Sequence, residues 1–186
     1  MSKLCPTYSD DSLDENTLRA AVLTSGSMWS ALDVVAQTGS TNADLLAAAK
    51  AGAPHGTVLA AEHQTSGRGR QGRAWSTPPE ARALTFSVLV RPAGVPPSGR
   101  GWLPLLTGVA VARALRAEAG VDAVLKWPND VLAGGAKLAG ILAEQVGDAI
   151  VVGIGINVSA RTEDLPPPGP GALAATSLAV LGAACT

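Results

Sequence analysis

The sequence predicts an α+β domain in which a mixed α/β sheet packs against a long helix. Residues 103–119 repeat apolar side chains at helical spacing and are followed by a glycine, which is typical of a core helix and its end. Residues 138–146 and 149–158 are two apolar strands joined by a two-residue turn, so they should be antiparallel neighbours. Strands and helices of this kind in one chain indicate a single layered sheet domain.

Composition places the chain among globular proteins with an aliphatic core. Of the 186 residues, 47% are hydrophobic, 16% charged and 3% aromatic. These values exclude disorder of the whole chain and leave Ala, Val, Leu and Ile to build the core. The formal net charge of −1 excludes a general attraction to nucleic acid or acidic membranes, so any recognition of anions has to be local.

The sequence also bounds the compartment and the metal chemistry. Cys5 and Cys185 are too few for a disulfide framework, which fits a reducing environment. The N-terminus is acidic and polar, and no stretch reaches the roughly 18 apolar residues of a membrane span. His55 and His63 have no partners at zinc-ligand spacing. We therefore expect a cytoplasmic protein without membrane attachment or a zinc site.

The first third of the chain predicts two strands and two helices. Residues 14–24 place apolar side chains at helical spacing behind polar capping residues. Residues 32–36 are a buried strand, and the polar turn 39–42 supplies an N-cap for an Ala-rich helix at 43–51. Residues 57–62 form the second strand.

The middle of the chain predicts a third strand and the long helix. The strand lies at 83–90, and an irregular Gly/Arg loop separates it from the second strand. A Pro/Gly-rich hinge at 92–101 leads into the helix at 103–119. The core face of this helix is expected to carry Leu106, Val109, Ala110, Arg113, Ala114 and Ala117.

The last third predicts antiparallel strands and an apolar end. A short strand at 123–126 is followed by a polar corner, and the pair Gly134-Gly135 then turns the chain into the strand 138–146. After the strand 149–158, residues 166–171 form a Pro/Gly-rich loop, and the Ala-rich stretch 172–184 is interpreted as a helix.

The strongest chemical signal is the loop at residues 67–75, GRGRQGRAW. Its three arginines alternate with glycine, so guanidinium groups and backbone N–H groups can meet one polyanion. The loop matches G-x-G-x-x-G, but no helix follows that could hold a pyrophosphate, which argues against a dinucleotide site. A P-loop is excluded because no Lys followed by Ser or Thr closes the motif. An RNA-binding or merely solvated Arg/Gly loop stays open.

Three further segments carry polar groups with two interpretations each. The run KWPND at 126–130 can bind ribose or a metal-bound phosphate, or can be a plain loop with a core Trp. Lys137 opens an apolar strand and is either a ligand-binding cation or a surface residue. The small residues of GIGINV at 153–158 allow a ligand to approach the backbone or mark a bulge.

Together these segments resemble the biotin protein ligase family, in the form found in high-GC actinobacteria. The resemblance covers about residues 32–178 and implies the catalytic fold of the class II aminoacyl-tRNA synthetase/biotin synthetase type. It rests on five blocks in family order: GSTN at 39–42, EHQTSGRGRQGR at 62–73, KWPNDV at 126–131, KLAGILAE at 137–144 and GIGINV at 153–158.

The resemblance implies an enzyme that activates biotin with ATP and Mg²⁺ to biotinyl-5′-adenylate. By the same resemblance, the enzyme then passes biotin to a lysine of the biotin carboxyl carrier protein of acyl-CoA carboxylases. Because the first step joins two anions, fixed cations are needed, and the resemblance implies Arg70, Arg73 and Lys137 as the catalytic residues. Mg²⁺ enters with ATP and is assigned no protein ligand.

The resemblance also implies two sets of binding residues. Ser40, Thr41 and Gln64 would hydrogen-bond the ureido ring, Trp75 would cover the ligand, and the 67–75 loop would close over the adenylate. The implied biotin-binding set is Ser40, Thr41, Asn42, Gln64, Gly67, Arg68, Arg70, Trp75, Lys137 and Gly140. The implied ATP or adenylate set is Arg70, Arg73, Trp75, Lys126, Asn129, Lys137 and Asn157.

Two departures from the family pattern shape the domain organisation. Residues 1–30 are an extension with a short helix, too small for the winged helix of bifunctional relatives, so no DNA binding is expected. Residues 31–186 are expected to hold the catalytic domain without the small C-terminal SH3-like domain, in a truncated product or a short homologue. A monomer and a homodimer both stay open.

Three other functions also stay open. A lipoate or octanoate ligase shares the fold and the acyl-adenylate chemistry but not the 67–75 loop. A biotin-binding module without turnover would bind biotin and release no pyrophosphate. An RNA-binding loop predicts steeply salt-dependent affinity, which the net charge of −1 disfavours.

Overall fold

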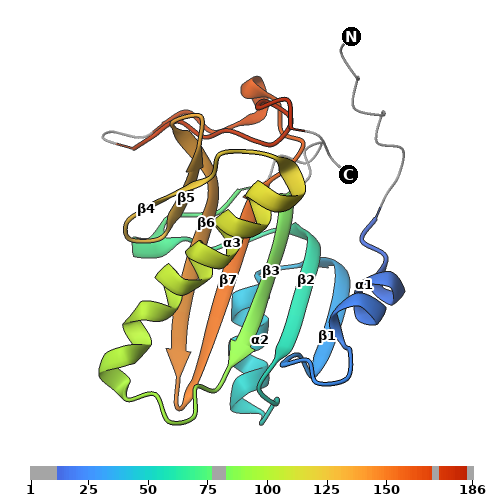
Figure 1. Ribbon diagram of the computed structural model, residues 1–186. Coiled ribbons are helices and arrows are strands. Elements are labelled where there is room, and N and C mark those ends of the chain that lie inside the picture. Colours follow the sequence, from blue (N-terminus) through green and yellow to red (C-terminus); the bar gives the residue numbers. More distant parts are fainter. Residues whose placement is uncertain (1–11, 77–82, 169–171, 184–186) are drawn as a thin grey trace.

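A seven-stranded sheet forms the centre of the fold in the computed structural model, which describes residues 12–76, 83–168 and 172–183 (Figure 1). The strand order is β1-β2-β3-β7-β6-β5-β4. Only the pair β1 and β2 is parallel among the named strands, and the neighbours from β2 to β4 along this order are antiparallel. The expected mixed sheet is therefore confirmed. The strands are β1 Ala31–Thr38, β2 Thr57–Gln64, β3 Ala83–Val90, β4 Val124–Lys126, β5 Asp130–Ala133, β6 Ala136–Val146 and β7 Ala149–Asn157.

Helices cover both faces of this sheet. α3 lies across one face and α2 lies behind the other, while α1 packs beside β1 at the sheet edge (Figure 1). The helices are α1 Glu15–Val22, α2 Thr41–Lys50 and α3 Leu103–Ala119, with short 3₁₀ turns at Arg70–Gly72, Pro97–Trp102 and Thr162–Asp164. These positions confirm the strand-turn-helix order expected for the first third and the bounds expected for the long helix.

Two helices begin at side chains that accept backbone hydrogen bonds. Asp14 caps α1 by accepting from the backbone N–H groups of Asn16 and Thr17. The hydrogen bonds from Thr17 and Asn16 hold the pKa of Asp14 below its usual value. Ser40 caps α2 in an extended conformation. The turn that precedes α2 thus fixes where this helix begins and brings its first residues to the end of β1.

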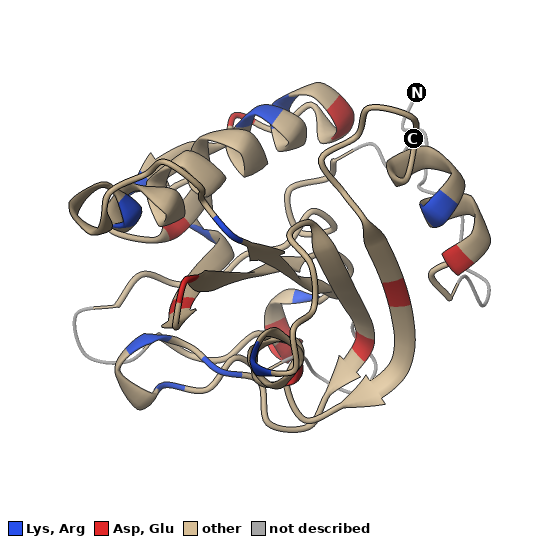
Figure 2. Cartoon of the chain, turned by 90° about the horizontal axis from the view of Figure 1, so that it is seen from below, with Lys and Arg blue, Asp and Glu red and all other residues tan. Residues whose placement is uncertain are grey.

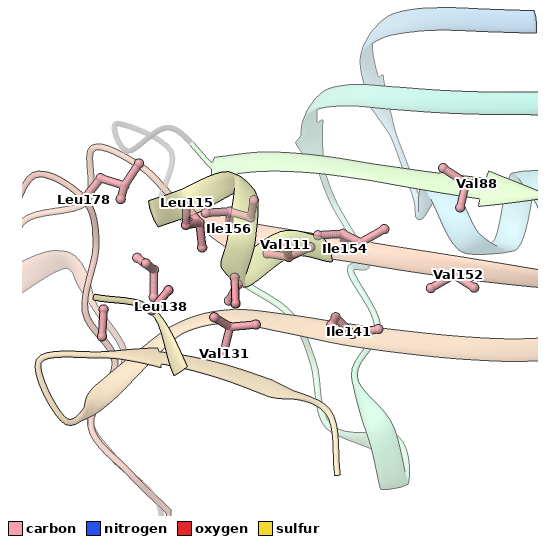
Figure 3. Packing of buried hydrophobic residues seen from close by; sticks show 14 of the residues in the cluster. Val88, Val111, Leu115, Val131, Leu138, Ile141, Val152, Ile154, Ile156 and Leu178 are labelled. Carbon is pink, nitrogen blue, oxygen red and sulfur yellow. The ribbon is translucent and has the colours of Figure 1, made fainter. Parts of the chain in front are cut away.

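The main core lies between α3 and the sheet. Val111 and Leu115 of α3 face apolar residues of the central strands (Figure 3). A second, smaller core lies under α2 and contains Leu45, Ala49, Leu89, Ala149 and Val151. Because β3, β6 and β7 are covered on both faces, their sequences are nearly continuous apolar runs.

The expected core face of α3 is wrong. The buried residues are Gly108, Val111, Ala112 and Leu115, whereas Leu106 is 62% exposed. The helix itself carries small and apolar side chains on several of its sides, so its sequence pattern is compatible with more than one buried face. Close packing decides between them, because a Cβ on Gly108 would lie 2.8 Å from Leu125 Cδ2.

The helix expected at 172–184 is also wrong for the described part, residues 172–183. This segment runs beside the start of β6: Lys137 donates its backbone N–H to Ala174 O (2.8 Å), and Thr176 donates to Lys137 O (2.9 Å). Residues 178–182 form turns. Pairing with a strand satisfies the backbone groups that a helix would otherwise satisfy internally, so a helical composition was overridden by tertiary contacts.

Two other expectations are limited by what is described. Cys5, Cys185 and residues 169–171 of the Pro/Gly-rich loop lie outside the described residues. Within the described ranges, none of the helices has the length and apolarity needed to cross a bilayer.

The burial of α3 gives a direct stability test. Leu115→Ala should lower the free energy of unfolding by about 2–5 kcal/mol, because it leaves a cavity in the main core. Leu106→Ala makes the same chemical change on the exposed side and should cost less than about 0.5 kcal/mol. Urea denaturation followed by circular dichroism measures both. Equal losses for the two variants would contradict the orientation of α3.

Candidate active site

The largest concentration of the predicted site residues lines one pocket on the α2 side of the sheet. The pocket holds about 660 Å³ of empty space, which includes space open to solvent. Its walls are the start of α2, the 67–75 loop and the central strands. The lining residues are Ser40, Thr41, Asn42, Gln64, Arg68, Gly69, Arg70, Arg73, Ala74, Trp75, Phe86, Asn129, Lys137, Gly140, Ile141, Leu142, Gly153, Ile154 and Gly155.

The wall formed by α2 and β2 is polar and largely buried. Thr41 donates its backbone N–H to Gln64 Oε1 (2.8 Å), which joins the start of α2 to the end of β2. The hydroxyl of Thr41 also lies 2.7 Å from Ser87 Oγ on β3. Gln64 therefore keeps its Nε2 donor, and Ser40 lies beside it in the lining. This wall can offer both donors and acceptors to a small polar ring.

Glycines in the central strands make the floor of the pocket. Gly140 of β6 and Gly155 of β7 are directly paired across the sheet, and the indole of Trp75 lies against both. A Cβ on Gly155 would lie 2.5 Å from Trp75 Cε2, and one on Gly140 would lie 3.1 Å from Cζ3. A Cβ on Gly153 would lie 2.2 Å from Asn42 Oδ1. The glycines of 153–158 thus make room for other side chains of this protein. They do not mark a bulge, because β7 pairs with both neighbouring strands without a register shift there.

The 67–75 loop forms a narrow hairpin over the pocket. Trp75 donates its backbone N–H to Gly67 O (2.9 Å), and Gly69 donates to Arg73 O (2.7 Å). The tip turns through Gln71, whose φ is 57°. Figure 2 shows basic positions along this loop, on the side of the sheet away from α3. The hairpin therefore carries Arg68, Arg70 and Arg73 together to the mouth of the pocket.

A bulge in β6 aims Lys137 into the pocket. Ala139 pairs with Val131 of β5, but the next pair joins Lys137 to Leu132, so Leu138 is an extra residue on β6. Without the bulge, side-chain alternation would place Lys137 on the α3 face. With it, Leu138 is fully buried in the main core and Lys137 lines the pocket. Lys137 therefore lies in the wall of the pocket, and its binding of a ligand stays a prediction.

Cations dominate the electrostatics of the pocket. Its lining contains four cations, Arg68, Arg70, Arg73 and Lys137, and no carboxylate. Lys137 Nζ is held by Asp130 Oδ1 at 2.7 Å, just behind the lining, and lies 5.9 Å from the centroid of the Trp75 ring. Arg68 is likewise paired with Glu144 at 3.0 Å, from outside the lining. Four cations against these two carboxylates leave a local excess of positive charge despite the near-neutral chain, so the site suits an anionic ligand.

Arg70 connects the hairpin to the polar corner after β4. Its Nη1 donates to Asn129 Oδ1 at 3.4 Å, and Asn129 Nδ2 donates to Ile141 O at 2.9 Å. Asn129 follows the Trp127–Pro128 peptide, which is cis. Trp127 is 76% exposed, so the interpretation of this segment as a loop around a core Trp is wrong. Because the side chain of Asn129 is fixed by a strand carbonyl, its oxygen is presented to the pocket.

Three of the implied residues lie outside the lining. Gly67 forms the base of the hairpin, where a Cβ would lie 2.3 Å from Trp75 O. Lys126 lies at the end of β4 with its Nζ 3.9 Å from Asp130 Oδ2. Asn157 donates its Nδ2 to Thr176 O (2.9 Å) and so holds the segment after β7. The structure brings the remaining implied residues together in one pocket.

Sequence reasoning assigned no role to Ser87 and Glu144, which contact the pocket residues from behind. Ser87 is fully buried on β3 and donates to Asn42 Oδ1 (2.6 Å). Glu144 accepts from Asn42 Nδ2 (2.9 Å) and pairs with Arg68 (3.0 Å). Their signal was weak, since each is one of several polar residues within a mostly apolar strand. In the part of the chain that is described, no group of three His, Cys, Asp or Glu side chains could hold a metal ion.

Comparison with known families identifies this fold. A model described as the biotin/lipoate A/B protein ligase family matches residues 34–160. The chain belongs to this family. The matched segment begins in β1 and ends just after β7, so it includes the hairpin, the bulged strand and the glycine floor.

Curated relatives of the family are longer than this chain. The biotin--[acetyl-CoA-carboxylase] ligase of Mycobacterium tuberculosis is 51% identical over 176 residues, which cover 92% of this chain and 64% of the relative. The bifunctional ligase/repressor BirA of Bacillus subtilis is 37% identical over 139 residues, covering 72% and 41%. The chain therefore spans less than two thirds of the length of these relatives.

Solved structures of the family have the same architecture. The biotin protein ligase from Aquifex aeolicus in complex with biotin and ATP superimposes with a TM-score of 0.68 and 34% identity, covering 83% of this chain and 62% of that one. The biotin protein ligase from Leishmania major in complex with biotin gives a TM-score of 0.69 and 26% identity, covering 83% and 67%.

The glycine floor yields a matched pair of substitutions. Gly155→Ala should displace the Trp75 ring, because its Cβ would lie 2.5 Å from two ring atoms. We expect a shifted tryptophan emission and a loss of ligand affinity of about ten-fold or more. Gly101→Ala is the control, since a Cβ there meets nothing within 4 Å and its φ is not positive. Unchanged emission in Gly155→Ala would contradict the position of Trp75.

Proposed function

We propose that this chain is the catalytic domain of a biotin protein ligase, which makes biotinyl-5′-adenylate from biotin and ATP. The observation that carries the proposal is the composition of the pocket: a polar wall at Thr41 and Gln64 and the cations Arg70, Arg73 and Lys137 line the same hollow. Biotin carries groups that suit both, with a ureido ring at one end and a carboxylate at the other. The names of the relatives and of the bound ligands in their structures support this substrate.

The first step places an attacking carboxylate beside a phosphate. A carboxylate oxygen of biotin attacks the α-phosphorus of ATP, the bond to the β-phosphate oxygen breaks, and pyrophosphate leaves. Both reactants are anions, so they repel each other until cations are placed between them. Lys137 is held for this by Asp130 at 2.7 Å, whereas Arg70 on the hairpin makes only a 3.4 Å contact with Asn129. Lys137 is therefore in place before the reaction, so little reorganisation is needed at this cation.

The same pocket suits protection of the adenylate. The hairpin with Arg68, Arg70 and Arg73 lies over the mouth, and Trp75 gives an apolar cover. Exclusion of water slows hydrolysis of the mixed anhydride. The buried Nε1 of Trp75 has no hydrogen-bond partner among the described residues, and a movement of the ring upon ligand binding would relieve this cost.

Magnesium and the acceptor protein complete the proposal. The side-chain oxygens of Asn129 and Asp130 are the type that Mg²⁺ prefers, and they lie next to the cations proposed for the phosphates.

In the second step, the ε-amine of a lysine on a biotin carboxyl carrier protein attacks the acyl carbon, the C–O bond to AMP breaks, and a proton is released. The cytoplasm, which supplies ATP and the carrier, is the proposed compartment.

Pyrophosphate release from biotin and MgATP tests the first step. The unaltered chain should release pyrophosphate only when biotin is present, and Arg70→Ala or Lys137→Ala should lower the rate by about 100-fold or more. Arg113→Ala removes an exposed arginine of α3, outside the pocket, and should leave the rate unchanged.

Other outcomes separate the alternatives. Release with lipoate but not with biotin would indicate a lipoate ligase. Thermal stabilisation by biotin without release would indicate a biotin-binding module, and steeply salt-dependent RNA binding without biotin binding would indicate an RNA-binding loop. Each of these results contradicts the proposed activity.

A further inference from the structure

A chain of hydrogen bonds runs from the polar wall of the pocket to the Arg/Gly hairpin. It begins at Thr41, whose hydroxyl lies 2.7 Å from Ser87 Oγ. Ser87 Oγ donates to Asn42 Oδ1 at 2.6 Å, and Asn42 Nδ2 donates to Glu144 Oε2 at 2.9 Å. The second carboxylate oxygen of Glu144 accepts from Arg68 Nη2 at 3.0 Å. Four elements, α2, β3, β6 and the hairpin, are joined by these contacts.

The donors in this chain all point toward Glu144. Ser87 has one hydroxyl hydrogen, and its bond to Asn42 Oδ1 uses it, so Thr41 is the donor in the Thr41–Ser87 contact. At 2.7 Å this contact is shorter than the alternative bond from the Thr41 hydroxyl to Gln64 Oε1, which measures 3.2 Å. Asn42 accepts with its oxygen and donates with its nitrogen. Each bond therefore polarises the next in the same direction, and the series ends on an anion, which strengthens it.

Burial makes the inner part of the chain rigid and leaves its outer end adjustable. Ser87 is 0% exposed, and Thr41 and Asn42 are also buried. The side chain of Glu144 is 23% exposed and that of Arg68 is 50% exposed. A change at the buried end cannot be compensated by water, whereas Arg68 on the hairpin can be bound or released.

We propose that Glu144 is a positioning residue that couples the polar wall of the pocket to closure of the 67–75 hairpin. A ligand ring that bonds to Thr41 alters the first bond of the chain, and Glu144 transmits the change to Arg68. The coupling rests on the proposed function in one respect, because it takes the ring of the substrate as the group that contacts Thr41. Neither Glu144 nor Ser87 lines the pocket, so both act through other residues.

Two substitutions interrupt the chain at different points. Glu144→Gln keeps an oxygen that accepts from Asn42 and removes the charge that binds Arg68. Ser87→Ala removes the hydroxyl that links Thr41 to Asn42, far from the hairpin along the chain of bonds. Glu163→Gln is the matched control, because Glu163 pairs with Arg161 at 3.4 Å and lies outside the pocket.

Hydrogen exchange of the hairpin amides, measured with and without biotin, tests the coupling. With biotin, Glu144→Gln should raise exchange at the N–H groups of Gly69 and Trp75 by about five-fold, as expected for a partly exposed charged bond. Ser87→Ala should raise the same rates by about two- to three-fold, and Glu163→Gln should leave them unchanged. In pyrophosphate release, Glu144→Gln should lower kcat by about five-fold with less than a two-fold change in KM for biotin.

Three results would overturn the proposal: hairpin exchange at the unaltered rate in Glu144→Gln, unaltered exchange in Ser87→Ala, or faster exchange throughout β3 and β7 in either variant. The last would indicate a purely structural role. Failure of the proposed function gives a different result, since the unaltered chain would then release no pyrophosphate. In that case, hairpin exchange measured without biotin would still test whether the Glu144–Arg68 pair holds the hairpin. Exchange that is no faster in Glu144→Gln than in the unaltered chain would contradict this role.

Discussion

The absence of side chains at Gly140, Gly153 and Gly155 is the constraint on which the pocket depends. β6 and β7 are central strands covered on both faces, so side chains at these positions would fill the space above the sheet. Their absence lets Trp75 and Asn42 lie directly on the backbone. One of these residues covers the pocket, and the other joins its polar wall to the hairpin, so the floor of the sheet organises both parts of the site.

A second constraint is the extra residue in β6. Leu138 enters the main core, and the change in alternation turns Lys137 to the opposite face. The cation is thereby attached next to a residue that is fully buried in the main core, while Arg68, Arg70 and Arg73 lie on the 67–75 hairpin, outside that core. A fixed cation and three adjustable ones suit a reaction in which a substrate must enter, react and remain covered.

Much of this architecture could be predicted from local patterns. The strand at 83–90 and the helix at 103–119 have the expected bounds, because turns and a terminal glycine mark their ends. The buried face of α3 could not be predicted, since its composition is apolar on several sides and packing against Leu125 selects one. The helix predicted for the end of the chain was wrong for a related reason: in the described residues 172–183, the backbone pairs with that of Lys137.

The motifs indicated which residues share the pocket, but not the contacts behind it. Arg70, Lys137 and Gln64 line one pocket, whereas Ser87 contacts Asn42 and Glu144 contacts Arg68 across large separations in the sequence. The central claim is that one pocket binds the ring, carboxylate and phosphate of a biotinyl adenylate together. Calorimetric titration with a non-hydrolysable biotinyl-adenylate analogue tests it most directly. We predict binding at least about 100-fold tighter than that of biotin, whereas an affinity within a few-fold of biotin would contradict the claim.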